Sequence, residues 1–307
     1  MTSFTKLAAA TAALFLVACD SGGAVKDAAD KAADAAQNAS EMAAKAGDTA
    51  KGMADKAGDA AKAALAGDAE LCTTFGPQTP RDISSVTGLN MADFEMAGDV
   101  SGMNLCNIHT HTNAEHKGPG FNVFVNDSDH GGYACNETDS LTAAELAPVA
   151  DQSFGYVKPG DTIEVHWVHT SCDIQPGEGL GSCLSDTCQA PLLRVEAQTF
   201  LVVNDGAALD FTSFGYDGNI VNGKHQAKAL PSGTGTPVVF RGSTTGPSYT
   251  QSVCSPLSVT WSVRPQCSKV DINSLNKWAK SGNVFNEKKS HGVRQLVTAP
   301  ELLSPIQ

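Results

Sequence analysis

The sequence has little positive charge, and its N-terminal apolar run is too short to cross a membrane. Its 307 residues include 21 Lys and Arg against 33 Asp and Glu, which gives a formal net charge of −12. This balance argues against nucleic acid or an anionic membrane surface as a binding partner. The run from Leu7 to Val17 has eleven residues, fewer than a bilayer-spanning helix requires.

Three common functional motifs are also missing. The sequence has no Gly-x-Ser-x-Gly elbow of the kind that serine hydrolases use. Residues 125–132 lack the spacing and the terminal Glu of an EF-hand loop. The Gly-rich residues 176–183 lack the strand–turn–helix context that phosphate binding requires. None of these three functions has support in the sequence.

The N-terminal segment has the features of an export signal. Lys6 precedes the apolar run, and the run ends in Leu16-Val17-Ala18-Cys19, which resembles the lipobox of bacterial lipoproteins. The resemblance implies removal of a signal peptide, residues 1–18, and lipidation of Cys19. We therefore expect a chain that is lipid-anchored on the periplasmic side of a bacterial cell envelope. An ordinary signal peptide that ends near a cysteine is the alternative.

Residues 19–70 differ abruptly in composition from the rest of the chain. From Ala24 to Glu70 the residues are mostly Ala, Lys, Asp and Gly, with no aromatic residue. The four residues 45–48 recur at 56–59, and this period of eleven fits a weakly amphipathic helix. With so little apolar surface the segment cannot form its own core. We interpret it as a helical or disordered tether; a helix that binds an envelope partner is the alternative.

Eight cysteines remain when Cys19 is set aside, at positions 72, 106, 135, 172, 183, 188, 254 and 267. An even number of cysteines in an exported chain predicts up to four disulfides, because the compartment is oxidising. Cys183 with Cys188 and Cys254 with Cys267 are the plausible local pairs, although the sequence cannot choose among the possible connectivities.

Residues 71–307 have the pattern of a mainly β domain. Runs rich in β-branched and aromatic residues alternate with Gly, Asn, Asp and Pro clusters, at 121–126, 161–172, 192–204, 236–243 and 257–263. Short helices are predicted at 142–150 and 272–280. The order favours a β-rich α+β fold, with a central, mostly antiparallel sheet and long loops, over a βαβ repeat.

Histidines recur with strand periodicity in two of these segments. In Cys106–Gly118, His109 and His111 are two residues apart, so on a strand they project from the same face, with Asn107. His-x-His on a strand is a common way to present two imidazoles to one zinc ion. Two polar surface histidines are the alternative interpretation.

The run from Glu164 to His169 suggests a third metal ligand. On a strand, Glu164 and His166 share a face, whereas Trp167 and His169 share the opposite one. A zinc-bound imidazole usually gives its second N–H to an acceptor such as a carboxylate, so His166 beside Glu164 is the predicted third ligand. Cys172 has the same strand parity and is an alternative ligand, but the expected oxidising compartment favours a disulfide there.

These motifs resemble those of carbonic anhydrases. His109-Thr110-His111 with Glu115-His116, followed by Glu164-x-His166-x-x-His169, is similar to the zinc-binding pattern of the α class. The wider sequence at 76–83, 103–121 and 163–172 resembles more closely the δ class of diatoms and its bacterial relatives. The resemblance extends over roughly residues 70 to 300.

The resemblance implies that His109, His111 and His166 bind Zn²⁺, and that a zinc-activated hydroxide attacks CO₂ to give bicarbonate and a proton. It also implies that Glu115 orients a threonine hydroxyl near the metal. Thr244 and Thr245 are the candidates, although their run lacks one residue of the corresponding α-class motif. Thr250 remains possible.

Three further histidines have less definite roles. By the resemblance, His116 and His169 lie beside the metal ligands without binding the metal. His116 is also the main rival of His166 as third ligand, because it lies only five residues beyond His111. His130, in a turn-rich segment, is a candidate proton shuttle because imidazole titrates near neutrality; a plain loop histidine is the alternative.

Taken together, the residues and the resemblance predict a lipid-anchored, exported zinc carbonic anhydrase. A periplasmic lipoprotein that stores zinc would keep the histidines but would need no Glu115. A structural envelope lipoprotein with a decayed active site would bind no metal.

Overall fold

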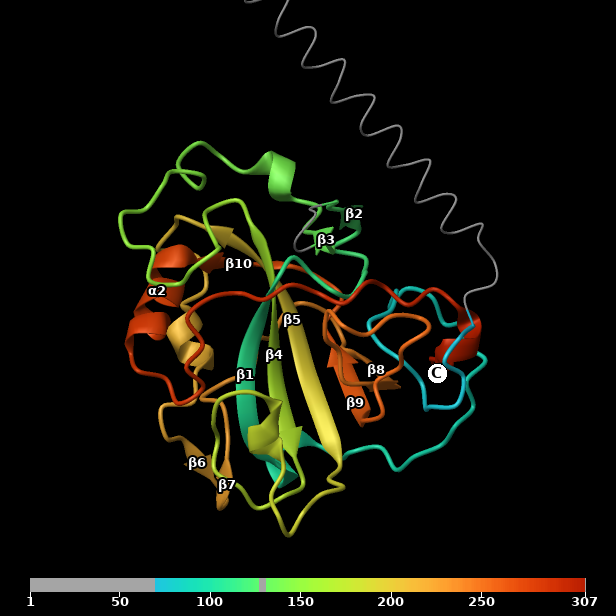
Figure 1. Ribbon diagram of the computed structural model, residues 1–307. Helices are drawn as coiled ribbons and strands as arrows, with labels where there is room; N and C mark the ends of the chain where they lie inside the picture. The colour runs from blue at the N-terminus through green and yellow to red at the C-terminus, as the bar shows by residue number, and fades with distance from the viewer. Residues whose placement is uncertain (1–69, 127–130, 307) are drawn as a thin grey trace, which may run out of the picture. The chain divides into compact units, whose positions relative to one another are not determined.

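A computed structural model describes residues 70–126 and 131–306 (Figure 1). The expected signal peptide and nearly all of the expected tether lie outside these residues, as do Cys19 and His130. Within the described residues, no helix is long and apolar enough to cross a membrane.

The centre of the fold is a six-stranded mixed sheet. Its strands in spatial order are β1 (Asn104–Thr112), β4 (Thr162–Thr170), β5 (Leu193–Val203), β9 (Ser258–Val263) and β8 (Val238–Ser243), and β10 (Ser268–Asp271) also pairs with β5. The β1–β4, β4–β5 and β8–β9 pairings are antiparallel, whereas β9 and β10 run parallel to successive parts of β5. The predicted β-rich fold with a mostly antiparallel central sheet is confirmed.

The remaining elements are short. Two small hairpins pair β2 (Val123–Phe124) with β3 (Tyr133–Ala134) and β6 (Ile220–Val221) with β7 (Lys224–His225). The 3-10 turns are η1 (Val100–Gly102), η2 (Thr138–Ser140), η3 (Leu180–Cys183), η4 (Phe211–Phe214) and η5 (Pro300–Leu302). The strand expected over 121–126 is thus reduced to β2, whose two residues are both exposed.

Each face of the sheet has its own core. On one face Val165, Trp167 and Phe200 belong to one buried cluster with Leu275 and Trp278 of α2 (Ile272–Lys280); we call this the helix-side core. The opposite face, the site-side core, is formed by residues that include Val168, Val195, Val259 and Trp261. Because neighbours in a strand point to opposite faces, β4 sends Trp167 to one core and Val168 to the other.

The helix α2 confirms one of the two helix predictions. Asp271 caps its N-terminus by accepting a hydrogen bond from the Asn273 amide. The helix predicted at 142–150 is wrong, because residues 143–146 form only turns. Pro148 has no amide hydrogen and disfavours a helical Ala147, so the turn cannot continue as a helix.

Four disulfides connect the eight cysteines, as the count predicted. They are Cys72–Cys254, Cys106–Cys183, Cys135–Cys267 and Cys172–Cys188. Both local pairs expected from spacing are wrong. The sheet brings distant segments together, and three of the bridges join residues 77 to 182 positions apart.

Candidate metal centre

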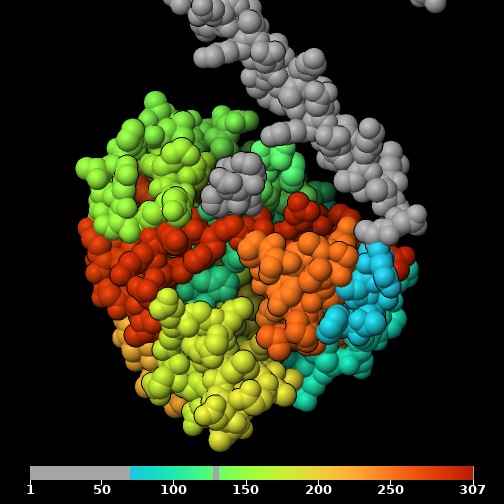
Figure 2. All heavy atoms as spheres, in the orientation of Figure 1, coloured from blue at the N-terminus to red at the C-terminus, as the bar shows by residue number. Residues whose placement is uncertain are grey.

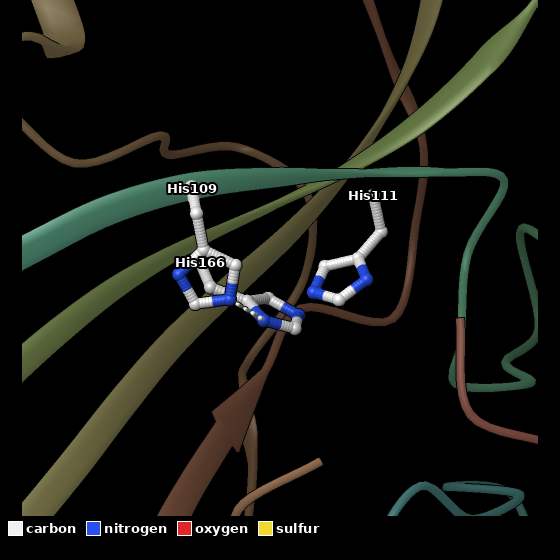
Figure 3. A group of neighbouring side chains, drawn as sticks. All are labelled: His109, His111 and His166. Carbon is white, nitrogen blue, oxygen red and sulfur yellow. Dashed lines mark hydrogen bonds between the residues drawn. The ribbon is translucent and has the colours of Figure 1, made fainter. Parts of the chain in front are cut away.

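The pairing of β1 with β4 places three histidines together on the site-side face. In the antiparallel register, His109 lies opposite His166, and His111 lies opposite Glu164. Figure 3 shows the His109 and His111 rings descending from β1 toward the His166 ring. Strand periodicity accounts for this arrangement, because residues two apart share a face.

The three rings are close enough to share one metal ion. Their centroids are 5.1 Å apart for His109 and His111, 5.0 Å for His109 and His166, and 4.7 Å for His111 and His166. One ring nitrogen from each lies within 4.8 Å of the others. His109 Nε2 and His166 Nδ1 are 3.3 Å apart.

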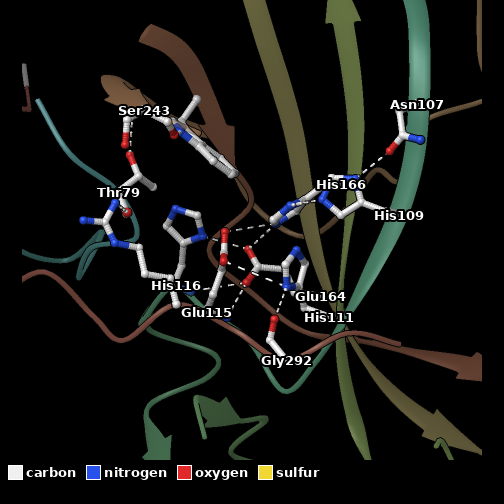
Figure 4. Close-up of polar contacts among 12 residues, drawn as sticks. Thr79, Asn107, His109, His111, Glu115, His116, Glu164, His166, Ser243 and Gly292 are labelled. Atoms are coloured by element: carbon white, nitrogen blue, oxygen red, sulfur yellow. Dashed lines mark hydrogen bonds and ion pairs between the residues drawn. The ribbon is translucent and has the colours of Figure 1, made fainter. Parts of the chain in front are cut away.

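The other ring nitrogens have neighbours that fix the orientation of each imidazole. His109 Nδ1 is 2.7 Å from Asn107 Oδ1, and His111 Nδ1 is 3.3 Å from the carbonyl oxygen of Gly292 (Figure 4). His166 Nε2 lies 3.4 Å from Glu164 Oε1. These contacts leave Nε2 of His109, Nε2 of His111 and Nδ1 of His166 as the candidate ligand atoms.

The nitrogen His111 Nε2 supports this assignment, because it is buried and has no hydrogen-bond partner among the described residues. His166 Nε2 is likewise buried and forms no hydrogen bond of standard geometry, although Glu164 Oε1 lies 3.4 Å away. A buried polar atom without a partner is uncommon in a folded protein and calls for an explanation. A metal ion between the three candidate ligand atoms would satisfy His111 Nε2.

Burial keeps the clustered histidines neutral, which is the form that binds a metal. It lowers the pKa of His109 well below the ordinary value, and the neighbouring His166 and His111 lower it further. Burial likewise lowers the pKa of His111 to about 3, and it lowers the pKa of His166.

Two buried carboxylates lie behind the imidazoles. Glu164 Oε2 accepts hydrogen bonds from the amides of Glu115 (2.6 Å) and His116 (3.2 Å), and Oε1 lies 2.9 Å from His116 Nδ1. Burial alone would raise the pKa of Glu164, but His116 and His166 hold it well below the ordinary value. Glu164 is therefore an ionised anchor that fixes both histidines.

Glu115 has a different environment. Its carboxyl oxygens lie 4.0 Å from His111 Nδ1 and 3.8 Å from His166 Nε2. Burial and the neighbouring Glu164 raise the pKa of Glu115 well above the ordinary value, and the Thr245 side chain opposes this rise. Thr245 thus approaches the carboxyl, although no hydrogen bond of standard geometry joins them.

Thr244 and Thr245, the two candidate threonines that directly follow β8, have different partners. Thr244 Oγ1 forms a hydrogen bond of 2.5 Å with Ser255 Oγ. Thr245 is half-buried and is the one of the pair that interacts with Glu115. The third candidate, Thr250, uses its hydroxyl within its own turn, where it accepts from the Val253 amide at 3.0 Å.

A close approach positions this threonine pair. Gly242 lies so near Thr79 that an added Cβ would be 1.9 Å from Thr79 Oγ1, so only glycine fits. Thr79 Oγ1 in turn accepts a hydrogen bond of 3.0 Å from the Ser243 amide (Figure 4). The segment 76–83 thereby holds the end of β8 against the site.

His116 lies behind the cluster rather than within it. Its ring is 6.4 Å from that of His166 and packs on Trp261 at 4.7 Å. It belongs to a second group, Glu115, His116 and His166, whose ligand atoms also lie within 4.8 Å of one another. The structure therefore offers two sets of metal ligands that share His166.

The structure does not bring His169 to the metal ligands, which corrects the expectation for that residue. His169 is on the opposite face of β4, buried, with Nδ1 3.0 Å from the carbonyl oxygen of Trp167. The alternation of side chains along a strand requires this placement, because His169 is three residues from His166. Cys172, the alternative ligand, is in a disulfide.

Two cavities, one narrow and apolar and one wide and mixed in character, meet at His109 and His111. An apolar cavity of about 70 Å³ is lined by the three histidines, Thr244, Thr245 and apolar residues, among them Val168, Leu180, Leu184, Val195 and Trp261. A wider basin of about 850 Å³ is lined by polar residues that include Glu178, Glu287, Lys288 and His291. In Figure 2, residues in the teal-green colour of β1 lie at the floor of a hollow between the yellow, orange and red segments.

Sequence reasoning missed three contributors to the site. Asn107 was placed on the face of His109 but was given no role; its spacing of two residues was the available signal. The Gly292 carbonyl and Trp261 left no such signal, because only the tertiary fold brings residues 261 and 292 to the β1–β4 pair.

Comparisons with known proteins agree with the resemblance seen in the sequence. The family model of delta carbonic anhydrase matches residues 100–274, which is 175 of the 307 residues and more than half of the chain. No curated protein matches the sequence significantly.

Several solved structures share a low similarity with the chain. A hyperthermostable carbonic anhydrase from an active hydrothermal vent chimney has 15% identity and a TM-score of 0.26, with 72% of this chain and 83% of that chain covered. The α-carbonic anhydrase of Thermovibrio ammonificans, solved with sulfanilamide, has 16% identity and a TM-score of 0.24, with 70% and 82% covered. The α-carbonic anhydrase of Photobacterium profundum has 17% identity and a TM-score of 0.24, with 72% of this chain and 87% of that chain covered.

These TM-scores are too low to support an inference about this chain, so the assignment rests on the family match. That match extends over β1, β4 and β5 and includes all three clustered histidines. The chain belongs to the delta carbonic anhydrase family.

Proposed function

We propose that the chain hydrates CO₂ reversibly, with a zinc ion held by Nε2 of His109, Nε2 of His111 and Nδ1 of His166. The observation that carries the proposal is the grouping of three neutral imidazole nitrogens where an apolar cavity meets a wider basin that also contains charged residues. Three histidines with an open fourth position are a ligand set of catalytic zinc. When bound, zinc lowers the pKa of a water molecule and so supplies the nucleophile, for which carbonic anhydrase is itself the reference case.

The two cavities suit the two sides of the reaction. CO₂ is small and has no net charge, so it would enter the apolar cavity beside the three histidines. The oxygen of water attacks its carbon, one C=O π bond breaks, and bicarbonate and a proton result. Both products are charged, and the wider basin, whose lining includes Glu287, Lys288 and His291, is the side toward which they would leave.

Glu115 and Thr245 would direct the attacking water. The positive charge of a bound zinc ion would oppose the raised pKa of Glu115 and favour its ionised form. A carboxylate accepts hydrogen bonds only, so the ionised Glu115 would accept a hydrogen bond from the Thr245 hydroxyl. Thr245 Oγ1 is then left to accept a hydrogen bond from the attacking water, which fixes the direction of a lone pair. Glu164 and Asn107 would hold the His166 and His109 rings in the tautomers that leave the ligating nitrogens free.

The test is to measure zinc content and CO₂ hydration in purified wild-type protein, His109→Ala and the control His225→Ala. His225 contacts Tyr216 at 2.6 Å and is outside both candidate ligand sets. We expect one zinc per wild-type and His225→Ala chain, and loss of zinc and of activity in His109→Ala. Zinc and activity that persist in His109→Ala would refute the proposal.

We also propose that the enzyme is exported and lipid-anchored at Cys19 on the periplasmic side of the envelope. Four disulfides indicate an oxidising, exported location. The lipobox-like sequence before Cys19 supports the anchor. In a Gram-negative host, a palmitate analogue should label the wild-type chain and leave Cys19→Ser unlabelled; equal labelling would contradict the anchor.

A further inference from the structure

The segment between Cys172 and Cys188, here called the stapled segment, is fixed at its ends and near its middle. The Cys172–Cys188 disulfide closes it, and the Cys106–Cys183 disulfide ties it to β1. The Ser182 hydroxyl donates to the Cys106 carbonyl at 2.9 Å. The stapled segment is therefore held against the strand that carries His109 and His111.

A single amide side chain connects this segment to the metal centre. Asn107 Nδ2 donates to the carbonyl oxygen of Gly177 at 3.0 Å, and Asn107 Oδ1 contacts His109 Nδ1 at 2.7 Å. The position of the stapled segment is thus coupled to the orientation of one of the clustered imidazoles.

Leu180, the first residue of η3, lies where the two cavities adjoin. It lines both the apolar cavity and the basin, as do His109 and His111. Leu180 is therefore an apolar side chain at this boundary, and the backbone beneath it is fixed by the stapled segment. Its side chain is 37% exposed, so its truncation removes part of a wall without emptying a buried core.

The size of the apolar cavity limits which molecules can occupy it beside Leu180. At about 70 Å³ the cavity has room for only a few water-sized groups. Such a space suits CO₂, which has three heavy atoms, better than an aryl ester, which has several times as many. The adjoining basin, at about 850 Å³, has room for a larger molecule.

We propose that Leu180 determines substrate size in this site: its side chain separates the apolar cavity from the basin and restricts the reaction to small electrophiles. The inference rests on the proposed function. The basin reaches His109 and His111, whereas His166 lines only the apolar cavity. Removal of the Leu180 side chain would join the two spaces beside all three histidines, so that a larger electrophile in the basin reaches the same nucleophile.

The direct test compares Leu180→Ala with wild-type protein and Leu209→Ala. Leu209 is 38% exposed, almost the same as Leu180, and lines neither cavity. The probe is 4-nitrophenyl acetate: water oxygen attacks the acyl carbon, the bond to the phenolic oxygen breaks, and acetate and 4-nitrophenolate are released with protons. We expect kcat/KM for the ester to rise at least about tenfold in Leu180→Ala alone.

Leu180→Met provides a volume-conserving control and should keep the wild-type ratio of ester to CO₂ turnover. If kcat/KM for the ester is unchanged in Leu180→Ala, or falls in parallel with CO₂ hydration, the inference is wrong. If wild-type zinc protein does not hydrate CO₂ at all, the proposed function itself fails.

A binding measurement separates these two failures, because it needs no turnover. Azide and benzoate both carry one negative charge but differ greatly in size. By calorimetry on zinc-loaded protein, Leu180→Ala should bind benzoate more tightly relative to azide than wild-type or Leu209→Ala does. An unchanged ratio of the two affinities would overturn the role of Leu180 whatever the activity.

Discussion

Burial decides the charge state of each clustered histidine. His111 is 5% exposed and His166 is 1% exposed, and an imidazolium in such a place loses its hydration. The lowered pKa values follow from this desolvation first and from the neighbouring imidazoles second. A neutral imidazole is the form that binds a metal, so the folded protein keeps these histidines in the binding-competent form even without a metal ion.

The same pKa shifts predict how the stability of zinc-free protein depends on pH. His111 has a folded pKa of about 3 and an ordinary value of 6.5. Below pH 6.5 the His111 imidazole is protonated in the unfolded chain, whereas in the folded chain it stays neutral until the pH approaches 3. Stability should therefore be full above pH 6.5 and should fall as the pH decreases toward 3, by about 1.4 kcal/mol per pH unit for this histidine.

Urea unfolding of zinc-free protein at pH 7.5, 6.5 and 5.5 measures this dependence. His111→Asn should reduce the slope below pH 6.5 by about one proton, because its side chain does not titrate. An identical slope in the two proteins would contradict the neutral, buried state of His111.

The two adjacent threonines give a matched pair of variants. Thr245 interacts with the Glu115 carboxyl, whereas Thr244 donates to or accepts from Ser255. Thr245→Val should lower kcat for CO₂ hydration by about 10- to 100-fold, the usual effect of removing a group that orients a ligand. Thr244→Val should chiefly reduce stability, by about 1 kcal/mol, through its lost hydrogen bond. Stopped-flow measurement of CO₂ hydration, together with urea unfolding, distinguishes the two variants. A large loss of kcat in Thr244→Val with unchanged kcat in Thr245→Val would show that Thr244 has the orienting role.

At the scale of elements, strand periodicity made the centre of the site predictable. The spacing of His109 and His111, and of Glu164 and His166, specified which side chains share a face, and the β1–β4 register then brought the two pairs together. The pairing itself could not be read from either strand alone. The choice between His166 and His116 as third ligand depends on that pairing, because His116 lies beyond the end of β1.

Contacts between segments far apart in the sequence were not predictable. The pairing of Cys106 with Cys183 depends on how the stapled segment folds back on β1, and no local pattern reveals it. The wrong prediction of a helix at 142–150 has a local cause: the apolar spacing favoured a helix, but Pro148 does not allow one to continue. The strands were identified because their composition is a local property.

The Cys106–Cys183 bridge should matter more for the site than Cys72–Cys254 does. Removal of either bridge, as a double Cys→Ser variant, should reduce stability by about 4 kcal/mol, because each closes a long loop. Only the Cys106/Cys183 variant should also raise the Kd for zinc, because its bridge holds the segment that Asn107 connects to His109. Competition with a chromophoric zinc chelator measures this, and equal zinc affinity in both variants would contradict the connection.

At the scale of the whole molecule, the disulfides connect the periphery to the sheet. Cys72 near the start of the described residues is joined to Cys254, and Cys135 is joined to Cys267 just before β10. A domain with three such long-range bridges depends on an oxidising compartment for its folded state. The acidic net charge of −12 agrees with a soluble substrate rather than a nucleic acid.

The proposed zinc site can be located by a crystal structure of zinc-soaked protein with anomalous diffraction at the zinc edge. We expect a single ion about 2.0–2.1 Å from Nε2 of His109, Nε2 of His111 and Nδ1 of His166. An ion bound instead by Glu115, His116 and His166, the second set within reach, would contradict it.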